Sequence, residues 1–240
     1  MATRATRSVP ELGGDAMARI ESAATRLFIL HGYNGVSYLD IARELGITHS
    51  SIHYYYRTKA VLAEAVLRRV ADATLGAMKG IWADSGTSLF DKFVATRNWI
   101  YAQYLVSNPG GKGGKPWGLL WRLSMDADSL PAGMKRFLRA NVDKLEDHIA
   151  GGVAAAVAGR ELVADAPVEG ITLQIASLMS ATGQVTRHAA GFERLDELMR
   201  WTLAGIMRAY GAVGVRPRGW PALPAPADMQ QAEPEVVSRW

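Results

Sequence analysis

The chain contains no cysteine among its 240 residues, which excludes disulfide bonds, cysteine-bound zinc sites and thiol nucleophiles. It also lacks a long apolar run. Residues 149–159, the longest mostly apolar stretch without a charge, fall short of the roughly eighteen residues that a membrane-spanning helix needs. The N-terminal segment has arginines but no apolar core of the kind found in signal peptides. These absences predict a cytoplasmic protein with no membrane span.

Alternating strand patterns are missing as well, and apolar residues recur at helical spacing through most of the chain. This periodicity predicts an all-α fold. The pattern sets off a flexible arm at 1–12, a helical part at 13–211 and a proline-rich mobile tail at 212–240. The formal net charge of +4 permits an anionic partner such as nucleic acid without requiring one.

The stretch GITHSSIHYYYRTKA has the pattern of a tight turn followed by a short surface helix. Gly46 suits a turn that needs a positive φ, and Thr48 suits a helix N-cap. Ile52 and Tyr56 share the side of the helix that packs inward. Two short helices joined by such a turn, packed on a preceding helix, predict a helix-turn-helix at about residues 36–55.

The same stretch holds no acidic residue between Glu44 and Glu64, although a solvated helix face normally mixes both signs of charge. Its outward side chains are short hydroxyls, imidazoles and a phenol, which suit base edges and phosphates: His49, Ser50, Ser51, His53 and Tyr54. Lys59 begins the next helix and can offer its ammonium to the same phosphate strand. We predict that this surface binds double-stranded DNA.

The segment RIESAATRLFILHGYNGVSYLDIARELGITHSSIHYYYRTKAVL resembles the DNA-binding domain of the TetR family of transcriptional regulators. The shared features are Ala-Ala-x-x-Leu-Phe in the first helix, a Gly-Tyr turn, Asp-Ile-Ala in the second helix, and an aromatic run followed by a small polar residue and lysine. The resemblance implies DNA contacts at Ser37, Thr48, Lys59 and the surface from His49 to Tyr54. The family usually has Gly at Ser50, Tyr at His53 and Phe at Tyr56, so its base preferences do not transfer to this chain.

The resemblance also implies a DNA-binding domain at 13–73 and a ligand-binding and dimerisation domain at 74–211. Helices between Val61 and Gly159 are expected to wrap a small-molecule cavity, and the last two helices to form a dimeric four-helix bundle. Apolar and small residues at helical spacing agree with such a seam. The residues that we assign to the dimer interface are Leu178, Leu195, Leu198, Trp201, Thr202, Gly205, Ile206 and Ala209. For Trp201, burial within one subunit is an equally good interpretation.

Four tryptophans fall within forty residues of the region that the family uses for ligands. With neighbouring side chains they are candidates to line an aromatic pocket, although core packing is the better explanation for any one of them. The candidates are Trp82, Arg97, Trp99, Gln103, Trp117, Trp121, Arg122, Met125 and Phe137. The loop at residues 108–116 is either a lid over such a pocket or a solvated connection.

These features together predict a homodimeric repressor that a small molecule releases from a near-palindromic operator. The alternative is a helical enzyme or adaptor that has kept the fold without DNA binding. The sequence predicts no enzyme, cofactor or metal site: GGKGGKP lacks the Gly-Lys-Ser/Thr order of a phosphate loop, and His49 with His53 lack a third metal ligand.

Overall fold

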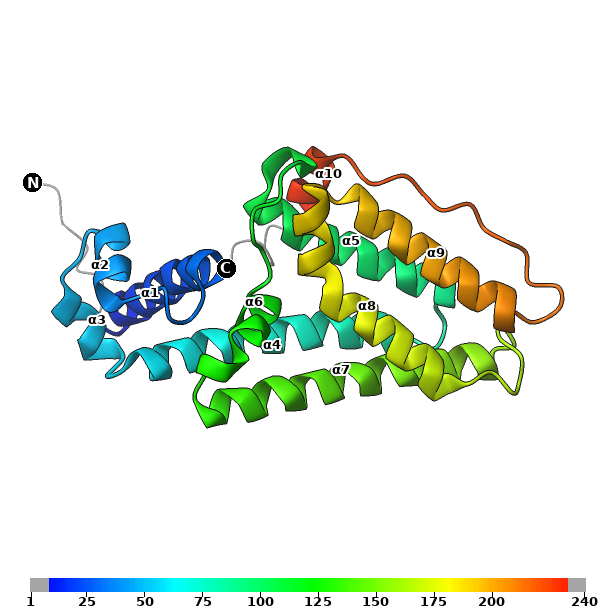
Figure 1. Cartoon of the computed structure of the whole chain (residues 1–240), viewed down its shortest axis with the longest axis horizontal. Coiled ribbons are helices and arrows are strands. Elements are labelled where there is room, and N and C mark those ends of the chain that lie inside the picture. The colour runs from blue at the N-terminus through cyan, green and yellow to red at the C-terminus, as the bar shows by residue number, and fades with distance from the viewer. Residues whose placement is uncertain (1–8, 233–240) are drawn as a thin grey trace, which may run out of the picture.

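The computed structural model describes residues 9–232 (Figure 1). Within these residues, β-type pairing is confined to two isolated bridges, and no helix is long and apolar enough to cross a bilayer. The predicted all-α fold is confirmed. In chain order the elements are α1 (Val9–His31), α2 (Tyr38–Leu45), α3 (His49–Tyr55), α4 (Lys59–Trp82), α5 (Leu89–Ser107), η1 (Pro109–Gly111), α6 (Leu119–Met125), η2 (Ala127–Ser129), α7 (Ala132–Ala158), α8 (Val168–Ala189), α9 (Glu193–Tyr210) and α10 (Pro226–Ala232).

Capping side chains set the ends of the short helices near the N-terminus. The Ser37 hydroxyl accepts a hydrogen bond from the Asp40 amide at the start of α2, and Gly46 ends that helix in the left-handed region with φ +64°. Thr48 caps α3 and Thr58 caps α4 in the same way as Ser37. The turns of this unit are therefore encoded locally in the sequence.

The helices α1, α2, α3 and the first half of α4 share one apolar core. Its centre includes Phe28, Ile41 and Leu62, all fully buried. Leu123 of α6 and Met134 of α7 belong to the same cluster, so elements from later in the chain complete this core. The N-terminal unit is consequently packed on α6 and the start of α7.

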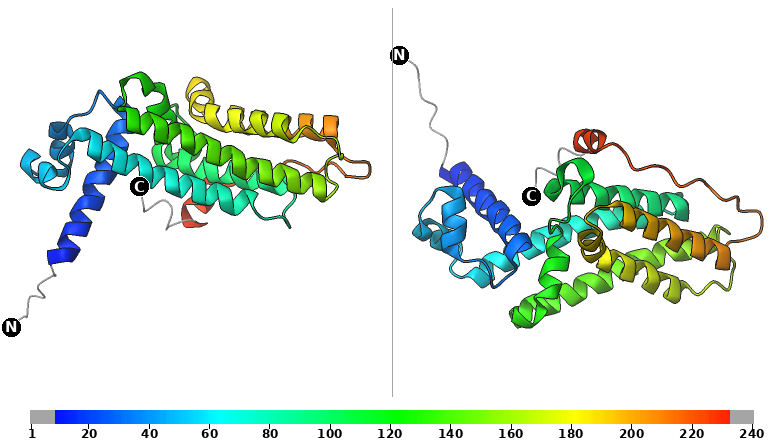
Figure 2. Two further views of the ribbon diagram at one scale, coloured as in Figure 1. Left: turned by 90° about the horizontal axis from the view of Figure 1, so that it is seen from below. Right: turned by 45° about the horizontal axis from the view of Figure 1, so that its top comes forward.

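A second apolar core lies in the bundle formed by the second half of α4 with α5, α7, α8 and α9 (Figure 2). Helix α4 contributes Leu62 to the first core and Trp82 to the second. The boundary predicted between residues 73 and 74 thus falls inside a continuous helix, which links the two cores.

The loop at residues 108–116 is anchored at several points. The Asn108 side chain donates to the Lys115 carbonyl at 3.2 Å and accepts from the Lys115 amide at 3.0 Å. The Gly113 amide donates to the Ala190 carbonyl at 3.0 Å, and the Tyr104 hydroxyl donates to the Gly113 carbonyl at 2.5 Å. These bonds tie the loop to α5 and to the end of α8, so it is a bonded connection between the two.

The two chain ends differ from the sequence prediction. The arm predicted at 1–12 lies mostly outside the described residues, but α1 already begins at Val9. The tail predicted to be mobile from 212 to 240 instead runs back along α9 and α5, as Figures 1 and 2 show, and forms α10. Proline content indicates an irregular backbone and gives no information about such distant partners. Residues 233–240 lie outside the described residues.

Candidate nucleic-acid interface

Helix α3 is held against the N-terminal unit by its inward side chains. Ile52 is fully buried and Tyr56 is 3% exposed, as the sequence predicted. The Tyr38 hydroxyl donates to the Tyr56 carbonyl at 2.9 Å, and the Tyr56 hydroxyl donates to Glu21 at 2.5 Å. Burial raises the pKa of Tyr38 to about 12, so this phenol stays protonated as a donor at neutral pH.

The outward side of α3 presents polar and aromatic groups to solvent. His49, Ser50 and His53 are exposed, and Tyr54 is 84% exposed. The rings of His49 and His53 meet edge to face with centroids 4.5 Å apart, and His53 meets the Tyr38 ring at 4.8 Å. The two imidazoles therefore form one packed row instead of two independent side chains.

Three of the predicted DNA contacts also have structural roles. The Ser37 amide and hydroxyl donate to Asp40 at 2.8 and 2.6 Å, which completes a capping box at α2. These bonds lower the pKa of the Asp40 carboxyl below its ordinary range. The Thr48 and Ser51 hydroxyls are 2.8 Å apart, so the Ser51 hydroxyl is already engaged at the cap of α3.

Lys59 supports the turn between α1 and α2. Its ammonium donates to the Tyr33 carbonyl at 3.0 Å and to the Val36 carbonyl at 3.2 Å, and it lies 4.4 Å from the centroid of the Tyr33 ring. Burial lowers the pKa of this ammonium. Because an ammonium has three N–H donors, one donor is left for a phosphate.

A surface groove separates the α1–α2 turn from α3. Its lining joins four predicted DNA contacts to residues that the sequence prediction missed, among them Asn34 and Asp40. Asn34 has an exposed side-chain amide in the turn. Its position after Tyr33 indicates a turn but does not identify it as a residue of the groove. The full lining is Asn34, Gly35, Val36, Ser37, Tyr38, Asp40, His49, His53 and Lys59.

Residues 20–66 match the family model described as bacterial regulatory proteins of the tetR family. This range contains α2, α3 and every residue of the groove. Residues 20–66 carry the TetR-family domain. The helix-turn-helix is accordingly a DNA-binding domain for transcription regulation.

Several solved structures, among them two described as TetR transcriptional regulators, have the same fold. NemR from E. coli in its reduced form is 15% identical, with a TM-score of 0.64 over 84% of this chain and 100% of NemR. A TetR regulator from Chloroflexus aurantiacus J-10-FL is 17% identical, with a TM-score of 0.70 over 85% of this chain and 100% of its own. One from Legionella pneumophila is 21% identical, with a TM-score of 0.65 over 84% and 99%. No curated protein sequence matches the chain.

The pocket suggested by the TetR resemblance is not assembled from its nine candidate residues. Phe137 packs against the N-terminal core and under the Arg68 guanidinium, whereas Trp82 and Trp117 are buried in the second core. Met125 is 64% exposed. Helical spacing identified apolar faces correctly but could not say which of the two cores each face joins.

Two cationic candidates for the pocket have other partners. Arg122 pairs with Asp126 at 2.9 Å, and Arg97 pairs with Asp196 at 3.2 Å and with the C-terminal segment. Of the other candidates, Trp99 packs against the second core and lies one turn from Gln103 on α5. Trp121 packs against the Gly183 backbone of α8. The Gln103 Nε2 atom is buried without a hydrogen-bond partner among the described residues.

The predicted dimer residues fall into two sets. Leu178, Leu195 and Ile206 are buried in the core of their own chain, because they face the interior of the bundle. The remaining residues form one outward stripe on α9, where Leu198 is 40% and Trp201 is 62% exposed. The stripe consists of Leu198, Trp201, Thr202, Gly205 and Ala209.

Proposed function

We propose that this TetR regulator is a homodimeric repressor that binds a near-palindromic operator through α3 and leaves it when a small molecule binds. The observation that carries the proposal is the outward side of α3. Helix α3 is capped by Thr48 and its inward side is buried. Its outward side presents hydroxyls, imidazoles and a phenol beside the Lys59 ammonium. The nearest carboxylate in the groove, that of Asp40, is occupied by Ser37.

The α9 stripe supports the homodimer. Trp201 and Leu198 lie beside a shallow groove between α8 and α9, so each copy presents both an apolar projection and a recess. A two-fold axis through this face pairs each stripe with its equivalent. The two α3 helices of such a dimer meet half-sites about one helical turn, roughly 34 Å, or a simple multiple apart.

Contacts of α6 support the ligand response, because they connect α8 with the α1–α2 turn that lines the groove. Trp121 packs on α8, and five residues later Asp126, at the C-terminal end of α6, accepts a hydrogen bond from the Tyr33 amide at 2.8 Å. Gly32 has φ +73°, and a Cβ there would lie 2.2 Å from the Asp126 carboxylate. The α1–α2 turn is therefore packed directly on α6. A ligand that moves α6 shifts the population of groove geometries.

The test is selection of bound fragments from random DNA, followed by a screen of small molecules for release of the best fragment. We expect a two-fold symmetric consensus and at least one compound that both binds the protein and weakens operator binding at fixed salt. Absence of any enriched sequence contradicts operator recognition. Unchanged operator affinity with every compound that binds contradicts the ligand response.

A further inference from the structure

The irregular segment at residues 216–222, here called the strap, lies along α5 and α9 (Figure 1). Among the described residues, no backbone-to-backbone hydrogen bond involves positions 216–224. Side chains therefore provide its attachment, in contrast to the helices that it crosses.

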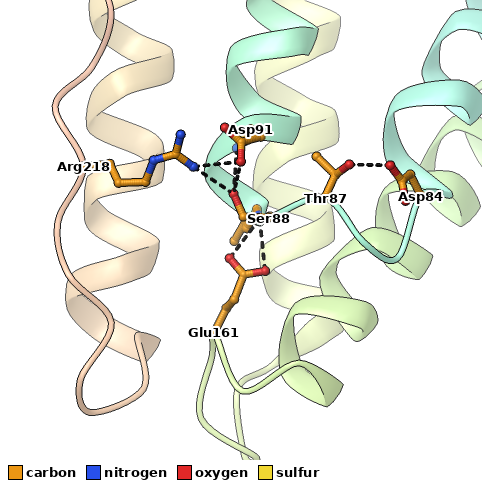
Figure 3. A network of polar contacts seen from close by, with 7 residues as sticks. Asp84, Thr87, Ser88, Asp91, Glu161 and Arg218 are labelled. Carbon is orange, nitrogen blue, oxygen red and sulfur yellow. Dashed lines mark hydrogen bonds and ion pairs between the residues drawn. The ribbon is translucent and has the colours of Figure 1, made fainter.

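Arg218 makes the first attachment, at the start of α5 (Figure 3). Its guanidinium donates to Asp91 at 2.7 Å and to the Ser88 hydroxyl at 3.2 Å, and it lies 4.2 Å from the centroid of the Phe90 ring. The hydrogen bond from Arg218, with that from Ser88, lowers the pKa of the Asp91 carboxyl. This attachment is exposed, so water and salt compete with it.

Trp220 makes the second attachment. Its indole N–H donates to Asp196 of α9 at 2.8 Å, and its ring meets Phe90 of α5 edge to face with centroids 5.9 Å apart. The Arg97 guanidinium lies 5.1 Å from the centroid of the indole ring. The indole thus contacts both α5 and α9.

Arg97 makes the third attachment and is only 1% exposed. Its Nη1 donates to the Pro221 carbonyl at 2.7 Å, and its Nη2 lies 3.5 Å from the Ala222 carbonyl. Because Asp196 already balances its charge, a neutral peptide carbonyl suits the remaining donors better than a second carboxylate. The cradle of Phe90, Arg97 and Asp196 therefore matches a peptide with an indole and adjacent carbonyls.

We propose that this cradle is a recognition site for a Trp-Pro peptide, and that the chain's own strap is its releasable occupant. Pro217 and Pro221 restrict the backbone, so little conformational entropy is lost on docking, as in other proline-rich ligands of aromatic grooves. The few side-chain contacts, of which that of Arg218 is exposed, make release possible without unfolding any helix. Release removes the bridge that Trp220 makes between Phe90 of α5 and Asp196 of α9, while the ion pair between Arg97 and Asp196 remains.

The first experiment measures release in the full-length protein. Trypsin cleavage of the Arg218–Gly219 bond is expected to be about tenfold faster in Trp220→Ala than in the wild type, because cleavage follows the population of the open strap. Arg216→Ala is the matched control, since Arg216 is exposed and has no hydrogen bond or ion pair with the described residues. It should leave the rate at Arg218 unchanged. Equal rates in wild type and Trp220→Ala overturn the proposal.

The second experiment supplies the occupant in trans as a labelled peptide spanning residues 215–224. We expect it to bind the Trp220→Ala protein at least about tenfold more tightly than the wild type, whose own strap competes at a high effective concentration. The same peptide carrying Trp220→Ala should bind neither protein. Arg218→Ala repeats the comparison with a change at an exposed side chain, which protects the test against misfolding. Equal binding to wild type and variants, or no binding to either variant, overturns the proposal.

Discussion

Lys59 shows how one side chain serves both the fold and the proposed DNA surface. Two of its donors hold the α1–α2 turn, and one is left for a phosphate. We expect Lys59→Ala to lower the free energy of unfolding by about 1–2 kcal/mol and to weaken binding to all DNA sequences, with the salt slope reduced by about one. Urea denaturation and binding at several salt concentrations measure both effects.

Lys144→Ala is the control for this change, because Lys144 is an exposed lysine on α7, away from the groove. It should leave both stability and the salt slope unchanged. If Lys59→Ala binds DNA with the same salt slope as the wild type, Lys59 does not contact a phosphate and has only its structural role.

Variants of the two adjacent serines of α3 distinguish contact with DNA bases from helix capping. The Ser50 side chain is exposed, whereas the Ser51 hydroxyl lies 2.8 Å from the Thr48 hydroxyl. We expect Ser50→Ala to cost about 1 kcal/mol on the operator and little on random DNA. Ser51→Ala should act mainly on the stability of the cap. Titrations with operator and random DNA make the comparison, and an equal loss on both for Ser50→Ala would contradict base reading.

At the scale of elements, the glycine pair in α7 offers two neighbouring tests. A Cβ at Gly151 meets nothing within 4 Å, whereas a Cβ at Gly152 would lie 2.6 Å from the Trp82 ring. Gly151→Ala should raise the free energy of unfolding by up to about 1 kcal/mol through helix propensity. Gly152→Ala should lower it by about 1–3 kcal/mol through overpacking. Chemical denaturation of the two variants decides, and a stabilising Gly152→Ala would contradict the packing of α7 on α4.

The cap of α2 gives the protein a pH-dependent element. The Ser37 hydrogen bonds hold the pKa of Asp40 below its ordinary value of 3.8, so ionised Asp40 stabilises the folded state above that value. This contribution is lost as the pH falls through the lowered pKa. We expect Asp40→Asn to melt below the wild type at neutral pH, with a gap that narrows as the pH falls below 3.8. Thermal unfolding followed by circular dichroism tests this, and a gap that persists at low pH would contradict the role of the charge.

The helices and the fold class were predictable because their signals are local. Ser37, Gly46 and Thr48 act on their own turns, and apolar spacing assigns inward faces such as that of Ile52. The partners of those faces were not predictable. Arg97 reaches Asp196 and Pro221 across long sequence separations, and no local pattern encodes those pairs.

At the scale of the whole molecule, the α9 stripe makes the assembly testable. Trp201→Glu places a charge in an exposed apolar position, which repels its copy across a two-fold axis. We expect the variant to sediment as a monomer and to lose most of its operator affinity. Val142→Glu, at a 40% exposed position on α7, is the control and should remain dimeric. A dimeric Trp201→Glu would place the interface elsewhere.

Helix α4 has a mechanical consequence because it belongs to both cores. Its 24 residues span about 36 Å. Trp82, at one end, is buried in the bundle, and Lys59, at the other end, is hydrogen-bonded to the α1–α2 turn. A tilt of about 5° around the Trp82 end displaces the other end by roughly 3 Å, given that length. An angular change of α4 that is too small to repack the bundle therefore moves the groove between the α1–α2 turn and α3 by about the spacing of one base pair.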